Sequence, residues 1–238
     1  MQRHRVQALL MGGQACVFYG AAEFSRDTDL AILASAENLA RLGEALGELQ
    51  AAPIAVPPLT IEYLERGHGV HFRCQAEGVA GMRVDVMSVL RGLPAFPTLW
   101  DRRTTVTAAG GVYELMALPD LVLAKKTQRD KDWPMIRRLV EASWFEHRAA
   151  PTAAQVAFWL RELRTPNLLI DVARANAATT AAMIAQRPLL AHAVAGREDS
   201  LAEAILAEER AERALDRDYW RPLRAELEQL RRARHPDS

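Results

Sequence analysis

The chain has 238 residues, which is enough for one large domain or two small ones, and half of them are hydrophobic, which suffices for a buried core. Thirty basic and thirty acidic residues give a formal net charge of zero, so the composition provides no broad electrostatic attraction to nucleic acid. The two cysteines stand alone, no segment approaches the roughly 20 apolar residues of a membrane span, and the N-terminal apolar run is too short for a signal peptide, so we expect a soluble, cytoplasmic protein.

A pair of glycines follows the first apolar segment. Residues 7–11 fit a buried strand that leads into Gly12 and Gly13, and residues 14–20 fit one or two helical turns ended by Gly20. Backbone N–H groups at such a turn can bind an anion, and glycine lets a phosphate group approach closely. A glycine pair alone more often marks a plain tight turn, but the acidic residues that follow favour a phosphate site.

Two acidic residues begin the next apolar segment, residues 28–33. Asp27 and Asp29 are two positions apart, so in an extended strand their side chains point to the same face. Carboxylates placed side by side repel each other and need a cation, a proton or an arginine between them. Mg²⁺ is the natural candidate, because it is often held by one or two carboxylates together with substrate phosphates.

A third acidic residue lies inside a later strand. Leucines at three- and four-residue steps predict an amphipathic helix over residues 36–50, and alternating apolar residues predict strands over residues 69–75 and 82–89. Asp85 lies in the second of these strands, on the same face as Arg83. A carboxylate inside a strand needs a partner. A metal shared with the first two aspartates would supply one, and an ion pair with a neighbouring arginine is the alternative.

The second half of the chain reads mainly as helix. Residues 104–115 predict a hairpin with its turn at Gly110-Gly111, and helix-start signals open a helix over residues 119–128. Sequences typical of capping boxes begin further helices at Thr152 and Ser200, and an alanine-rich helix is expected over 167–185. Pro222 is expected to break or kink the last helix.

These residues resemble the nucleotidyltransferase superfamily, which has the polymerase-beta-like fold. The resemblance rests on Gly12-Gly13, on the Asp27-x-Asp29 motif and on a third carboxylate, Asp85. The segment Ala117–Lys125, followed by Arg129, Lys131 and Asp132, is similar to a stretch of many bacterial members. The chain is closest in pattern to bacterial branches that are uncharacterised, toxin–antitoxin-like or antibiotic-adenylyltransferase-like.

The resemblance implies an α/β fold and two domains. Residues 1–116 would form a catalytic domain with a mixed sheet and flanking helices, and residues 117–238 a helical C-terminal domain. It implies that the three aspartates bind Mg²⁺ or Mn²⁺ and that Lys125 lies near the nucleotide phosphates; a solvated basic helix end is the alternative for Lys125. Many members have serine at the second glycine position, and Gln14 or Ser25 could replace that hydroxyl.

The implied activity is transfer of a nucleoside monophosphate from a triphosphate, expected to be ATP, to an acceptor hydroxyl, with release of pyrophosphate. The acceptor stays open: a small molecule such as an antibiotic, an RNA end or a partner protein. Two other classes of function remain as alternatives. One is a nucleotide-binding or protein-interaction module of the same fold without turnover, for example a toxin–antitoxin component, and the other is a helical adaptor that binds no nucleotide.

Overall fold

The computed structural model describes residues 1–108 and 110–234, and their contacts divide the chain into two compact units. Unit 1 contains residues 1–124 and the part of the last helix that begins at Asp218; unit 2 is Lys125–Arg217. The sequence patterns placed a boundary between residues 116 and 117. In the structure, helix α5 (Leu118–Ala124) belongs to unit 1. One contact that ties it there is the ion pair of Arg102 with Asp120, whose Nε–Oδ2 distance is 2.7 Å.

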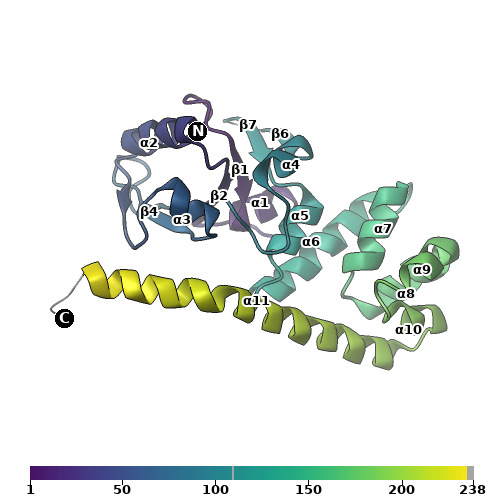
Figure 1. Ribbon diagram of the computed structural model, residues 1–238. Helices are drawn as coiled ribbons and strands as arrows, with labels where there is room; N and C mark the ends of the chain where they lie inside the picture. The colour runs from purple at the N-terminus through teal and green to yellow at the C-terminus, as the bar shows by residue number, and fades with distance from the viewer. Residues whose placement is uncertain (109, 235–238) are drawn as a thin grey trace. The chain divides into compact units, whose positions relative to one another are not determined.

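Unit 1 is built on a seven-stranded mixed sheet in the order β3-β4-β5-β2-β1-β7-β6 (Figure 1). Strand β2 runs parallel to β5 and β1 runs parallel to β7, while the other neighbouring pairs are antiparallel. The mixed α/β class expected from the sequence is confirmed. The strands are β1 (Ala8–Met11), β2 (Asp27–Ile32), β3 (Ala52–Pro53), β4 (Val70–Arg73), β5 (Arg83–Met87), β6 (Thr104–Ala108) and β7 (Gly111–Leu115).

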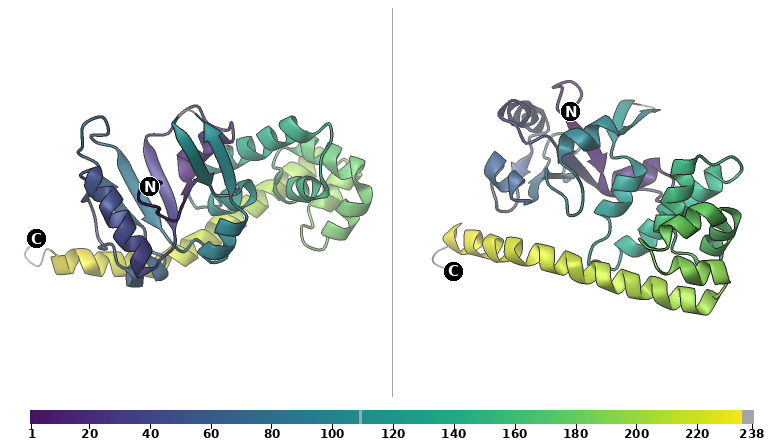
Figure 2. Two further views of the ribbon diagram at one scale, coloured as in Figure 1. Left: turned by 90° about the horizontal axis from the view of Figure 1, so that it is seen from above. Right: turned by 45° about the vertical axis from the view of Figure 1, so that its right-hand side comes forward.

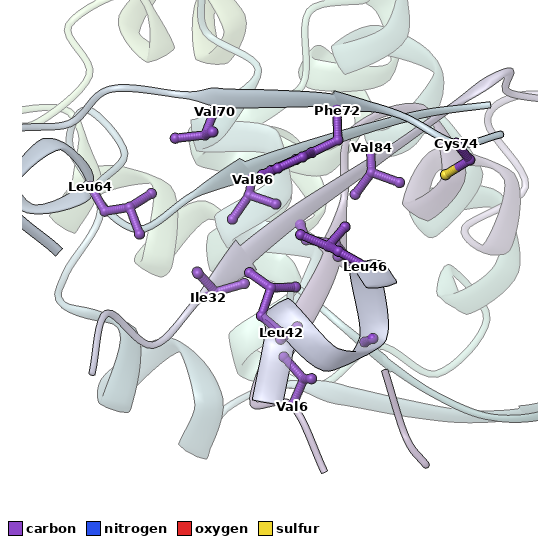
Figure 3. Packing of buried hydrophobic residues seen from close by; sticks show 13 residues of the cluster. Val6, Ile32, Leu42, Leu46, Leu64, Val70, Phe72, Cys74, Val84 and Val86 are labelled. Atoms are coloured by element: carbon purple, nitrogen blue, oxygen red, sulfur yellow. The ribbon is translucent and has the colours of Figure 1, made fainter. Parts of the chain in front are cut away.

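One face of this sheet carries the apolar core of unit 1. Alternate residues of β2, β4 and β5 point to the same face and are almost fully buried there. Helix α2 (Ala36–Glu48) covers that face (Figure 2) and contributes Leu42 and Leu46, which lie against Ile32, Val84 and Val86 (Figure 3). Because this face is apolar, the intervening polar residues of the same strands point to the opposite face.

Polar side chains fix how α2 joins the sheet. Ser35 caps the helix by accepting a hydrogen bond from the backbone N–H of Asn38. The buried Asn38 side chain accepts from the N–H of Gln7 at 2.7 Å and donates to the carbonyls of Gln7 and Leu33. The other short helices of unit 1 are α1 (Gly12–Phe18), α3 (Ile61–Glu65) and α4 (Phe96–Asp101). The sequence patterns did not predict α4 or β3.

The end of the last helix, α11 (Glu198–Arg234), belongs to unit 1. Its Glu226 pairs with Arg66 and with the fully buried His68, at 2.8 Å from Nε2. The expected break at Pro222 is absent, because α11 continues through it. The expected start at Ser200 is also wrong, since the helix already includes the two acidic residues before it, which suit its first turn.

Unit 2 consists of helices. They are α6 (Asp132–His147), α7 (Ala153–Glu162), α8 (Pro166–Ala175), α9 (Ala177–Met183), α10 (Leu190–Ala195) and the first part of α11. The capping box at the start of α7 is confirmed: Thr152 Oγ1 accepts from the Gln155 N–H, and the Gln155 side chain accepts in return. The helix expected over 167–185 is divided at Asn176, whose side chain bonds back to the Val172 carbonyl. Within the described residues, no helix has both the length and the apolar character needed to cross a membrane.

Unit 2 contains buried charges. Arg187 holds Glu208 through two hydrogen bonds, and it also donates to the carbonyls of Leu160 and Leu163. A second buried guanidinium, that of Arg164, lies 3.3 Å from the same Glu208 carboxylate and over the ring of Trp133. One carboxylate therefore compensates two buried positive charges.

Candidate functional site

The first glycine of the pair lies directly against the second aspartate. Gly12 joins β1 to α1 with φ of +64°, a left-handed conformation that favours glycine. Strand register brings them together, because Met11, just before it, is paired with Asp29 of β2. A Cβ at Gly12 would overlap the Asp29 carboxylate and would lie 2.7 Å from the Cβ of Asp29. Only glycine leaves room for this carboxylate beside the turn.

The second glycine is matched to a serine in the same way. A Cβ at Gly13 would overlap the hydroxyl of Ser25 and lie 2.9 Å from its Cβ. The Ser25 hydroxyl also donates to the backbone carbonyl of Asp27 at 3.1 Å. The hydroxyl of Ser25 therefore occupies the space into which a side chain at position 13 would extend.

The acidic residues share one face of the sheet, opposite the apolar core. In β2, Asp27 is exposed and Asp29 is half-buried. In the parallel pair of β2 and β5, Asp29 lies beside Asp85, and Asp27 lies beside Arg83. Neighbouring strands are only about 4.8 Å apart, so the side chains of each pair are close neighbours on that face. The structure thus brings Gly12, Asp29 and Asp85 into one row.

Asp85 forms the ion pair that the sequence left open as an alternative to a metal. Its Oδ1 accepts a hydrogen bond from Arg83 Nε at 2.9 Å and lies 2.8 Å from His71 Nδ1. Burial raises the pKa of Asp85, but the hydrogen bond and charge of His71, followed by those of Arg83, outweigh burial and hold that pKa below its ordinary value. Asp85 is therefore a stably ionised carboxylate.

The contacts of His71 define its protonation pattern. Its Nδ1 lies 2.8 Å from the Asp85 carboxylate and 3.3 Å from Nη2 of Arg83, and Nη2 can only donate. A carboxylate accepts, so Nδ1 must carry a proton toward Asp85. In the neutral ring the lone pair then resides on Nε2. Within the described part of the chain, Nε2 has no hydrogen-bond partner, and the His71 side chain is 32% exposed.

The residues available to a divalent cation are the two aspartates of β2. Among residues 1–108 and 110–234, no group of three or more Asp, Glu, His or Cys side chains is arranged to hold a metal ion. Asp27 and Asp29 suit a magnesium ion that takes one or two carboxylates and completes its coordination with substrate phosphates and water. Asp85 already satisfies its charge through Arg83 and His71, so it does not fit as the third ligand in this arrangement.

Lys125 is the first residue of unit 2 and is buried rather than solvated. Helix α5 ends at Ala124, so the helix expected to reach residue 128 is shorter. The reason lies in the next turn, where Thr127 and Arg129 donate to the Asp132 carboxylate. Lys125 Nζ lies 3.7 Å from the other oxygen of Asp132. The basic residues of this motif thus gather around one buried aspartate.

Two members of the site, His71 and Arg83, were not among the expected functional residues. The alternation within 69–75 and within 82–89 already placed each of them on the polar face of its strand. The pairing of His71 with Asp85 across β4 and β5 depends on strand register, which periodicity does not specify. The sequence matches no protein-family model and no curated protein sequence.

Proposed function

We propose that unit 1 is a magnesium-dependent nucleotidyltransferase that moves a nucleoside monophosphate from a triphosphate, expected to be ATP, to an acceptor hydroxyl. The observation that carries this proposal is the fit of Gly12 against Asp29, next to the fit of Gly13 against Ser25. It supports a turn whose exposed backbone can approach phosphates while carboxylates lie beside it. A plain tight turn has no need of this match between glycine and acid.

Each residue has a role that follows from its place. The Gly12-Gly13 turn would contact the phosphates through its N–H groups, and the Ser25 hydroxyl would provide the donor that many superfamily members have at the second glycine position. Asp27 and Asp29 would hold the metal. When bound, Mg²⁺ neutralises the charge that develops on the phosphates during in-line displacement. The acceptor class stays open among small molecule, protein and RNA.

A nucleotide-binding or protein-interaction module without turnover is the second candidate. The observation that favours it is the pairing of Asp85 with Arg83 and His71, which compensates this carboxylate without any metal. Such a module would bind a nucleoside triphosphate with Mg²⁺ but release no pyrophosphate.

The deciding experiment measures transfer from α-labelled triphosphates. The full chain is incubated with each labelled nucleotide, Mg²⁺ or Mn²⁺, and fractionated bacterial extract, beside the Asp27→Ala/Asp29→Ala variant. Arg73→Gln is a suitable control, because this side chain is exposed and contacts no other described side chain. We expect label on protein, RNA or a small molecule with the wild type and the control, and none with the double variant.

The other outcomes separate the alternatives. Metal-dependent nucleotide binding without transfer, lost in the double variant, would favour the module. If the wild type neither transfers nor binds nucleotide, the proposed function is refuted and only the α/β fold remains.

A further inference from the structure

We infer that His71 is the general base of the transfer reaction, taking the proton of the acceptor hydroxyl on Nε2, and that Asp85 positions it. The inference rests on the proposed function and adds a residue that the sequence did not indicate. It also changes the role of Asp85, which the sequence suggested as a metal ligand or as the base itself.

The first argument is geometric. His71 Nδ1 donates to Asp85 Oδ1 at 2.8 Å, which fixes the tautomer and leaves the Nε2 lone pair available. An imidazole oriented by a carboxylate is a recurrent arrangement of general bases. The ring is also packed in place: a Cβ at Gly69 would lie 3.5 Å from its Cε1 and 3.7 Å from its Nε2.

The second argument is location. Strand register aligns His71 with Asp85 and Asp85 with Asp29, so the three side chains lie in one row across β4, β5 and β2. Gly12 is at the end of that row, against Asp29. A base in this row lies on the same sheet face as the groups proposed to hold the triphosphate. The exposed third of the His71 side chain leaves access for an acceptor.

The third argument is the chemistry of Asp85. Arg83 donates to the same carboxylate oxygen as His71. A carboxylate compensated by two donors is a poor proton acceptor, and the lowered pKa of Asp85 agrees with this. Imidazole, with an ordinary pKa near neutrality, is better matched to take a proton at about pH 7.

In the proposed step the acceptor oxygen attacks the α-phosphorus of the triphosphate and a new O–P bond forms. The bond from the α-phosphorus to the bridging oxygen breaks, and pyrophosphate leaves with that electron pair. The proton of the hydroxyl passes to Nε2, so His71 becomes an imidazolium stabilised by the Asp85 carboxylate. Release of this proton to water restores the neutral ring, and the sum is triphosphate plus alcohol giving nucleotidylated acceptor, pyrophosphate and a proton.

The test compares two substitutions of the same residue with a control. In His71→Gln the amide N–H₂ can still donate to Asp85 but has no basic lone pair, whereas His71→Ala leaves space for added imidazole. Arg73→Gln, two residues further along β4 and exposed, is the matched control. Label transfer from α-labelled ATP into fractionated bacterial extract and binding of ATP with Mg²⁺ are measured for each protein.

We expect both His71 variants to lose about 10²- to 10⁴-fold in transfer rate while binding ATP normally, and we expect imidazole to restore part of the activity of His71→Ala. Nearly full activity of His71→Gln would refute the inference, because His71 would then only hold Asp85. Failure of imidazole to restore His71→Ala, with ATP binding intact, would also count against it. These results leave the proposed function standing, whereas a wild type without transfer would overturn both.

Discussion

Substitution of Gly12 by alanine tests whether the glycine turn and Asp29 are matched in space. Two costs are expected. An L-residue at φ of +64° costs about 1–2 kcal/mol relative to glycine. The added Cβ would also overlap the Asp29 carboxylate, and such overpacking typically costs about 1–3 kcal/mol. The free energy of unfolding should therefore fall by about 2–5 kcal/mol.

Gly20 provides the control that separates these two costs. Its φ is +69°, almost the same as that of Gly12, but a Cβ there would meet no atom within 4 Å. Gly20→Ala should therefore lose only the conformational cost of about 1–2 kcal/mol. Urea unfolding followed by circular dichroism measures both variants.

A double-mutant cycle with Asp29→Gly completes the test. Removing the Asp29 side chain should make Gly12→Ala cheaper by about 1–3 kcal/mol, since only the conformational cost then remains. Equal losses for Gly12→Ala and Gly20→Ala, with no coupling to position 29, would refute the close fit on which the proposed site depends.

Three further predictions concern polar groups. Asn38→Ala leaves the buried backbone groups of Gln7 without their partner and should cost about 2–4 kcal/mol in urea unfolding; a loss below 1 kcal/mol would contradict this role. The folded-state pKa of Asp85 lies below its ordinary value, so its stabilising effect is present above the ordinary pKa and is lost as the pH falls through the folded-state pKa. The stability difference between wild type and Asp85→Asn should therefore shrink on acidification, and a constant difference would argue against the ion pair. Glu208→Gln removes the charge between two buried guanidinium groups and should cost about 3–5 kcal/mol, whereas an unchanged unfolding midpoint would show that they need no counter-ion.

Local patterns determined much of unit 1. Alternation of apolar and polar residues identified β2, β4 and β5, and leucine spacing identified α2, because burial of one face imposes a period of 2 on strands and 3.6 on helices. The same reasoning placed Asp27 and Asp29 on one face. The glycine pair stood out because few residues tolerate the backbone conformation and close contacts of such a turn.

Other features depended on contacts between residues far apart in the chain. Register across three strands placed Asp29, Asp85 and His71 in one row, and a shift of one residue in any strand would reverse its faces. The match of Gly13 with Ser25 depends equally on how β1 and β2 pair. Helix α11 continues through Pro222, although local preference disfavours it, and tertiary contacts such as that of Glu226 with His68 contribute to holding the segment beyond it. Sequence therefore identified the chemical groups, and the pairing of strands decided which of them meet.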